Sequence, residues 1–152
     1  MNKYIIRDYR NEDYPQILSL WAETGLLKPE RNDTQESVEK CLSIGGKLLV
    51  MIDTSNNILI GSSWMTFDGR RINISHFGIR QSYQRKGLGT RLAKASLAYV
   101  YSHGYQVRLE VHKKNMVAKH IYEKLGFFAY TDYDIYMIRD VKKIPPENRE
   151  PF

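Results

Sequence analysis

Hydrophobic and polar residues follow two different periods along this chain. The segments 3–9, 47–53, 58–67 and 71–79 are rich in β-branched and aromatic residues, a composition typical of strands. The last three are separated only by the turn-forming sequences TSNN and DGR, which favour short antiparallel connections. The pattern therefore predicts one N-terminal strand and, later, a three-stranded antiparallel meander.

Four other segments carry apolar residues every three or four positions, which predicts amphipathic helices. Each begins near a small polar residue or a glycine-rich turn and ends at a glycine, as helix boundaries commonly do. The predicted helices cover approximately 11–25, 33–46, 88–103 and 115–126.

Two more strand-like segments complete the pattern, QVRLEV over 106–111 and one or two strands within 127–140. The resulting order predicts an α/β (α+β) fold in which helices flank a mixed, mostly antiparallel sheet. We expect a single domain over 1–141 and a Pro-rich, loosely ordered tail over 142–152.

Length and composition narrow the classes of protein. The chain has 152 residues, of which 42% are hydrophobic, and no apolar run approaches the roughly 20 residues of a membrane span. Its N-terminus lacks the apolar core of a secretory signal, and one cysteine cannot form an intrachain disulfide. We therefore expect a cytoplasmic protein without membrane contact, with Cys41 as a small core residue rather than a nucleophile.

Positive charge is concentrated in one part of the chain. Residues 80–124 contain ten Lys/Arg and two Asp/Glu, a net charge of +8, whereas the remainder contains 13 and 15, a net charge of −2. This distribution suits a polyanionic ligand, although a solvated basic face has the same signature. No strand interleaves aromatic and basic residues, so the pattern does not favour nucleic acid as a partner.

The sequence YQRKGLGTRLAKA, from Tyr83 to Ala95, places Gly87 and Gly89 between two cations and the start of an apolar helical repeat. Backbone N–H groups and the positive end of a helix meet at such a turn and favour an anion. The spacing fits neither a P-loop nor a G-x-G-x-x-G fingerprint, because Leu92 stands where the third glycine belongs. An ordinary turn into a helix remains the alternative.

Two motifs resemble the GNAT acyltransferase superfamily. Gln84 to Gly89 matches its [QR]-x-x-G-x-[GA] loop, and Leu109 to Phe127 is similar to its L-x-V…N-x-x-A-x-x-x-Y-x-x-x-G-F segment. The resemblance extends over Tyr4 to Arg139. The N-terminal half is similar to small bacterial acetyltransferases of the YpeA type, and the glutamate of LEV resembles that of ribosomal-protein N-terminal acetyltransferases.

The resemblance implies a GNAT fold in which two central parallel strands splay apart, with acetyl-CoA as cosubstrate. The pyrophosphate would lie on the loop amides, and the pantetheine arm would run between the two strands. The cofactor-binding residues implied in this way are Phe77, Gly78, Ile79, Gln84, Arg85, Lys86, Gly87, Leu88, Gly89, Thr90, Asn115, Ala118 and Tyr122.

Two residues are candidates for catalysis. Tyr122 takes the family's general-acid position, although its spacing also suits an aromatic residue on the core face of a helix. Glu110 is the candidate general base or, alternatively, a salt-bridge partner of a cation. Asn73 and Ser75 share a strand face where some relatives carry a base, but neither can act as one, and alternation predicts His76 on the opposite face.

We therefore expect an acetyl-CoA-dependent N-acetyltransferase that acts on a primary amine, of a small molecule or a peptide N-terminus, in a ternary complex. A non-catalytic acyl-CoA sensor or regulatory module on the same fold is the alternative, and a homodimer is compatible with either. The segment Gly25 to Asp33 is expected to wall the acceptor pocket, with Glu30 and Asp33 attracting a cationic amine. No His/Cys/Asp cluster has metal-ligand spacing, so no metal is expected.

Overall fold

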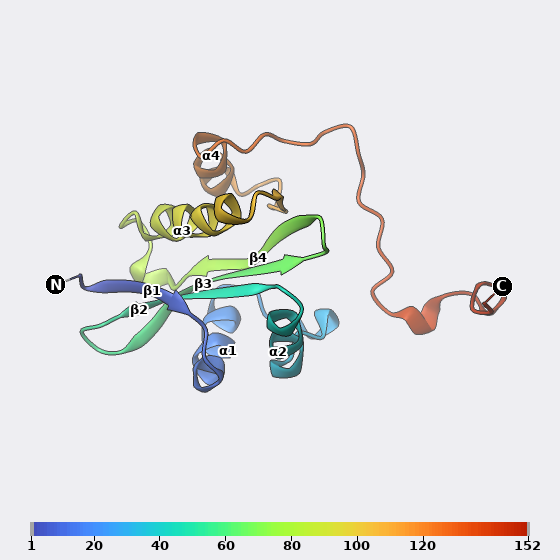
Figure 1. Ribbon diagram of the computed structural model, residues 1–152, viewed down its shortest axis with the longest axis horizontal. Helices are drawn as coiled ribbons and strands as arrows, with labels where there is room; N and C mark the ends of the chain where they lie inside the picture. Colours follow the sequence, from blue (N-terminus) through green and yellow to red (C-terminus); the bar gives the residue numbers. More distant parts are fainter. Residues whose placement is uncertain (1, 152) are drawn as a thin grey trace.

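The computed structural model describes residues 2–151, and its centre is a five-stranded sheet in the order β1-β2-β3-β4-β5 (Figure 1). The pairs β1–β2, β2–β3 and β3–β4 are antiparallel, and the pair β4–β5 is parallel. This confirms the predicted mixed, mostly antiparallel sheet and its meander. The strands are β1 (Tyr4–Asp8), β2 (Lys47–Asp53), β3 (Ile58–Phe67), β4 (Arg71–Ile79) and β5 (Gln106–Leu109).

Helices cover both faces of the sheet: α1 and α2 lie on one face, and α3 and α4 lie on the other (Figure 1). Their bounds are α1 (Tyr14–Glu23), α2 (Gln35–Ser43), α3 (Leu88–His103) and α4 (Met116–Lys124). Short 3-10 turns occupy Asn11–Asp13, Pro29–Arg31, Gln81–Tyr83, Val141–Lys143 and Pro146–Asn148. Within residues 2–151, no helix has both the length and the apolar character that a membrane span requires.

Caps mark three of the predicted helix boundaries, the start of α2, the end of α3 and the start of α4. The Thr34 side chain accepts a hydrogen bond from the Ser37 amide at 3.1 Å, and the Asn115 side chain accepts one from the Ala118 amide at 3.1 Å. Gly104 ends α3 in the left-handed conformation, with a φ of 71°, that glycine adopts at low cost. Local capping therefore fixes where α2, α3 and α4 begin or end.

Two hydrophobic cores lie on the two faces of the sheet. The core beneath α1 and α2 is centred on Trp21 and Trp64, whose rings stack with centroids 5.6 Å apart. Cys41 is buried in this core and accepts a hydrogen bond from Trp64 Nε1 at 3.2 Å, which confirms it as a core residue. The core beneath α3 contains Ile72, Ile74 and Leu92, so alternate residues of β4 face α3.

A β-bulge interrupts this alternation in β4. Trp64 pairs with Ser75 and Ser62 pairs with Gly78, so β4 has an extra residue between the two pairs. His76 has a φ of 44°, which turns its side chain toward α1 instead of α3. The prediction that His76 lies on the face opposite to Ser75 is therefore wrong, because the bulge shifts the period by one residue.

The C-terminal part of the chain departs from prediction in two ways. β5 ends at Leu109, so Glu110 and Val111 follow the strand instead of belonging to it. Residues 127–140, predicted as one or two strands, form no strand and extend away from the sheet (Figure 1). Aromatic and β-branched composition favours a strand only where an edge offers backbone partners, and this segment makes no backbone hydrogen bond to β5.

The bulge is held by a buried hydroxyl, which generates a test of the fold. Ser62 Oγ accepts from Trp21 Nε1 at 3.0 Å and donates to the His76 carbonyl at 2.6 Å. Replacement of Ser62 by Ala leaves both buried groups unpaired, so we expect a loss of about 2 kcal/mol, or about 4–8 °C in Tm, by calorimetry. Ser102→Ala, which removes an exposed side-chain hydrogen bond on α3, is the control and should change Tm much less. Equal Tm values for both variants would contradict this role of Ser62.

Candidate active site

The loop before α3 adopts an unusual backbone conformation. Arg85 has a φ of 62° and Gly87 a φ of 74°, so two residues of the turn are left-handed. Alternating backbone conformations of this kind turn successive N–H groups toward one concavity. The amides of Leu88, Gly89 and Thr90 follow in the first turn of α3, where helix geometry supplies no acceptor. Together these groups form a site suited to an anion.

Contacts from neighbouring elements hold this loop in place. Gln84 Nε2 donates to the Ile79 carbonyl at 2.9 Å, which ties the loop to the end of β4. The Tyr83 hydroxyl donates to Asp53 Oδ2 at 3.0 Å, and Lys86 Nζ lies 5.3 Å from the centre of the Tyr83 ring. The predicted loop residue Leu88 is buried in the core beneath α3, so only its backbone is available to a ligand.

The two glycines of the loop have different roles. Gly87 occupies the left-handed region, which a residue with a Cβ enters only at a cost. Gly89 lies inside α3, and the nearest atom to a Cβ there would be Ile79 Cγ1 at 3.9 Å. Gly87 therefore permits the turn, whereas Gly89 keeps open a space that the protein itself does not fill.

The sheet opens beside this loop. Pairing of β4 with β5 ends at Ile74 and Leu109, whereas β4 continues to Ile79. Phe77 projects to the α4 side, with its ring 6.1 Å from that of Tyr122. Gly78 faces the loop after α1, where a Cβ would meet Leu26 Cδ1 at 3.1 Å. The last residues of β4 thus have no strand partner on the β5 side, and this gap in the pairing is the opening between β4 and β5.

Tyr122 lies on the α3–α4 side of this opening. Its ring packs edge-on against Phe77 and Phe127, with centroids 6.1 and 5.6 Å away. Burial raises the pKa of the phenol to about 12, because the charged form loses its hydration. The phenol therefore remains a proton donor throughout the physiological pH range.

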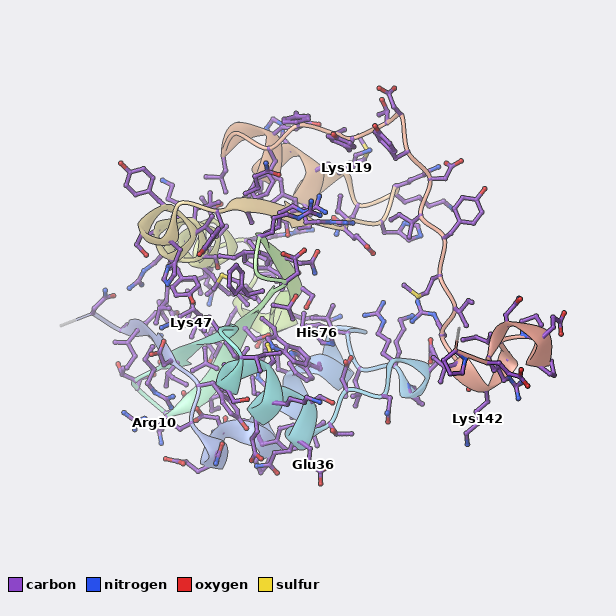
Figure 2. The ribbon with its side chains drawn as sticks, turned by 45° about the vertical axis from the view of Figure 1, so that its right-hand side comes forward. Arg10, Glu36, Lys47, His76, Lys119 and Lys142 are labelled. Carbon is purple, nitrogen blue, oxygen red and sulfur yellow. The ribbon has the colours of Figure 1, made fainter. Side chains whose placement is uncertain are left out.

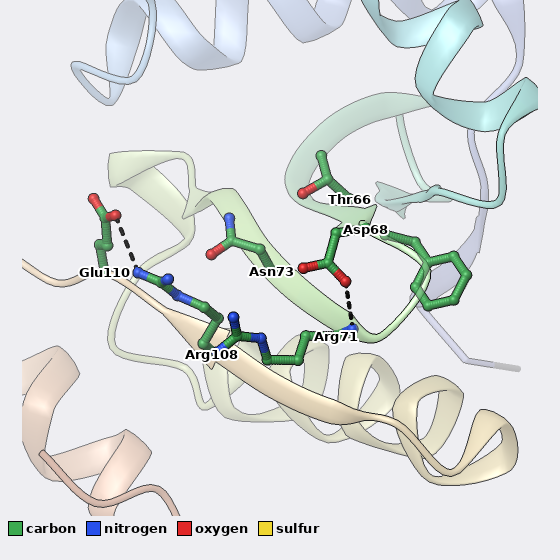
Figure 3. A pocket seen from close by; sticks show the side chains of 7 residues that line it. Thr66, Asp68, Arg71, Asn73, Arg108 and Glu110 are labelled. Atoms are coloured by element: carbon green, nitrogen blue, oxygen red, sulfur yellow. Dashed lines mark hydrogen bonds and ion pairs between the residues drawn. The ribbon is translucent and has the colours of Figure 1, made fainter. Parts of the chain in front are cut away.

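Glu110 lies on the other face, at a cavity of about 270 Å³ (Figure 3). Because Thr66 pairs with Asn73 and Asn73 with Arg108, these side chains share the face that α1 and α2 cover elsewhere. A carboxylate oxygen of Glu110 lies 3.5 Å from Arg108, and 59% of its side chain is exposed. Its position at a cavity suits the general-base interpretation, and its cationic neighbour Arg108 suits the salt-bridge interpretation. The cavity is lined by Thr66, Phe67, Asp68, Arg71, Asn73, Arg108 and Glu110.

A buried histidine–aspartate pair joins the bulge to the loop between α1 and α2. His76 Nε2 lies 2.7 Å from Asp33 Oδ2, and the His76 ring, labelled in Figure 2, packs against both Trp21 and Trp64. Burial lowers the pKa of His76, and the charge of Asp33 only partly opposes this effect. Sequence alternation missed this pair, although Gly78 in the strand is a recognisable signal of a bulge.

Segment 25–33, the expected wall of the acceptor pocket, has contacts with several parts of the chain. Leu26 lies near Gly78, since a Cβ added at Gly78 would meet Leu26 Cδ1 at 3.1 Å, and the role of segment 25–33 as an acceptor wall stays a prediction. Asp33, however, is engaged by His76, and Glu30 borders a second cavity of about 490 Å³ beside Met137. Within residues 2–151, no group of three or more His, Cys, Asp or Glu side chains has an arrangement that suits a metal ion.

A model of the acetyltransferase (GNAT) family matches residues 5–127. The chain therefore belongs to this family. The match includes the loop at 84–90, the opening between β4 and β5, and Tyr122. The fold class predicted from the sequence is confirmed.

Solved structures of acetyltransferases share the fold. An acetyltransferase from Streptococcus agalactiae superposes with a TM-score of 0.75 at 18% identity, covering 91% of this chain and 92% of that chain. Glucosamine-6-phosphate N-acetyltransferase from Arabidopsis thaliana gives 0.71 at 18% identity, covering 91% and 100%. The ribosomal-protein-S18-alanine N-acetyltransferase from Escherichia coli gives 0.71 at 19% identity, covering 84% and 79%. Identities this low establish the fold alone.

The difference between the two glycines predicts opposite effects of the same substitution. Gly87→Ala forces a Cβ into the left-handed region and should lower the free energy of unfolding by about 1 kcal/mol. Gly89→Ala should leave it unchanged or raise it by about 0.5–1 kcal/mol, because alanine favours a helix more than glycine does. Urea unfolding measures both, and a Gly89→Ala variant less stable than Gly87→Ala would contradict this assignment.

Proposed function

We propose that the protein transfers the acetyl group of acetyl-CoA to a primary amine by direct attack in a ternary complex. The observation that carries this proposal is the opening between β4 and β5, which has the anion-binding loop at its rim and Tyr122 and Glu110 on its two faces. Membership of the GNAT family supports acyl transfer in general. The lone, buried Cys41 suits a reducing compartment, and we propose a cytoplasmic location.

The residues beside the opening fit acetyl-CoA. The left-handed turn at Arg85 and Gly87 and the unfilled space at Gly89 suit a pyrophosphate, and Lys86 adds positive charge. The pantetheine arm would lie along the β4 backbone at 77–79. Gln84 acts by fixing the loop, since its side chain already donates to the β4 backbone. Asn115, which caps α4, and Ala118 in its first turn would contact the pantetheine arm from the α4 side.

Acetyl-CoA supplies an acyl group on a thiolate leaving group. Backbone amides at 77–79 polarise the thioester carbonyl while the amine nitrogen attacks its carbon. Glu110, directly or through water, accepts the proton that the amine loses, and the Tyr122 phenol donates a proton to the departing sulfur. The C–S bond breaks, an amide C–N bond forms, and no covalent enzyme intermediate is required.

A screen for thiol release tests this function against a non-catalytic acyl-CoA sensor. The enzyme is incubated with acetyl-CoA and amino acids, polyamines, aminoglycosides or peptides with free N-termini. We expect thiol release that depends on the amine and yields its acetylated product by mass spectrometry. Tight binding of acetyl-CoA without turnover on any amine would support the sensor instead.

The open space at Gly89 yields a prediction for binding of the cosubstrate. Gly89→Val places a branched side chain where a phosphate oxygen is proposed to lie, so calorimetry should show at least a 100-fold weaker affinity for acetyl-CoA. The variant should remain folded, because the nearest atom to a Cβ added at Gly89 is Ile79 Cγ1, at 3.9 Å. Gly89→Ala controls for loss of the glycine itself. Unchanged affinity in a folded Gly89→Val protein contradicts the proposed position of the pyrophosphate.

The buried phenol yields a prediction for the chemical step. Tyr122→Phe keeps the ring contacts with Phe77 and Phe127, so stability should change by no more than about 1 kcal/mol. Loss of the proton donor should lower kcat roughly 10- to 1,000-fold in single-turnover measurements, with little change in affinity for acetyl-CoA. Because the pKa of Tyr122 is about 12, the parent enzyme should not lose this proton donor below about pH 11. Transfer at the parent rate would exclude the phenol as the acid.

A further inference from the structure

The cavity beside Glu110 contains two arginines whose hydrogen-bonding capacity is unused. Arg71 on β4 and Arg108 on β5 both border it (Figure 3). Arg71 Nε is buried and has no hydrogen-bond partner within residues 2–151. Arg108 has one ionic neighbour, Glu110, at 3.5 Å, a distance beyond that of a strong charge-assisted hydrogen bond. A buried, unpaired donor is rare in native proteins, so it requires an explanation.

The nearby aspartate does not supply the missing acceptor. Asp68 Oδ1 accepts hydrogen bonds from the backbone amides of Arg70 and Arg71 at 2.8 and 2.7 Å. These bonds lower the pKa of Asp68 and hold one of its carboxylate oxygens in the turn between β3 and β4. Arg71 lines the cavity, and its guanidinium is a planar set of donors that matches a carboxylate.

We propose that this cavity is an acceptor subsite that selects an amine bearing a carboxylate, as a free amino acid does. Arg71 and Arg108 bind the carboxylate, and the amine lies toward Glu110 and the opening between β4 and β5. The volume of about 270 Å³ equals roughly nine water molecules, which suits a compound of amino-acid size. This inference rests on the proposed amine acetylation, because it defines the class of acceptor for that reaction.

Binding of a carboxylate in this subsite also explains the arrangement of Glu110. Its carboxylate lies near Arg108 in the absence of a ligand. A ligand carboxylate on Arg108 replaces Glu110 as the partner of that guanidinium. Glu110 is then free to accept the proton of the attacking amine. The two interpretations of Glu110, ion-pair partner and base, thereby describe two stages of one cycle.

Matched pairs of probes test the subsite by equilibrium binding. L-leucine is compared with isopentylamine and L-lysine with 1,5-diaminopentane, each titrated calorimetrically into the protein saturated with CoA. We expect each amino acid to bind at least 10-fold more tightly than its decarboxylated partner. Arg71→Met and Arg108→Met should each weaken amino-acid binding roughly 10- to 100-fold and leave the decarboxylated amines unaffected.

The control is Arg70→Met, which removes an exposed arginine from the adjacent turn that does not border the cavity. It should not change the preference, and melting temperatures verify that all three variants are folded. Equal or tighter binding of the decarboxylated amines overturns the subsite, as does failure of both amino acids to bind. The subsite is also overturned if neither Arg71→Met nor Arg108→Met changes the preference for amino acids over their decarboxylated partners.

The same probes distinguish failure of this inference from failure of the proposed function. Thiol release on decarboxylated amines alone would retain amine acetylation and reject the carboxylate subsite. Arginine-dependent binding of amino acids without any thiol release would retain the subsite and reject catalysis. With both proposals correct, the arginine variants raise KM for amino acids far more than they lower kcat.

Discussion

The candidate site depends on the point where β4 separates from β5. Up to Ile74 the two strands pair in parallel, and beyond it β4 bulges and continues to Ile79 paired with β3 alone. A fully paired sheet would be a barrier between the helices on its two faces. The separation leaves backbone groups of β4 on the β5 side without a strand partner and available to a bound molecule.

The bulge also determines which side chains meet in each layer. His76 turns into the core beneath α1, where its ring packs against Trp21 and bonds Asp33 and its carbonyl accepts from Ser62. Phe77 turns to the other face beside Tyr122. The proposed acid and base consequently lie on opposite faces and can act together only across the opening. Such an arrangement suits a reaction in which two substrates approach from different sides.

Most of the architecture follows from local sequence. The strands 47–53, 58–67 and 71–79 and the helix starts near residues 33 and 115 agree with their predictions, because alternation, turns and capping are local effects. The loop that contains Gly87 and Gly89 is also recognisable in the sequence, because two glycines directly before a helical repeat indicate a tight turn into a helix.

Features that depend on contacts between distant segments could not be predicted from the sequence. The orientation of His76 depends on one extra residue in β4, and its bond to Asp33 joins residues 43 positions apart. The unpaired Arg71 Nε arises only when β4 and β5 meet, and the segment 127–140 has strand composition without a strand partner. The periodicity of hydrophobic residues describes one segment at a time, whereas each of these features depends on how two separate segments meet.

Hydrogen exchange with mass spectrometry, with and without saturating CoA, tests the central claim most directly. If the loop and the unpaired end of β4 hold the cosubstrate, the ligand should slow exchange of backbone amides in residues 84–91 and 77–79. Amides in α1 and α2 should change little, because these helices cover the opposite face. Saturation with CoA that leaves exchange at 84–91 unchanged, or protects a distant element instead, would contradict the account.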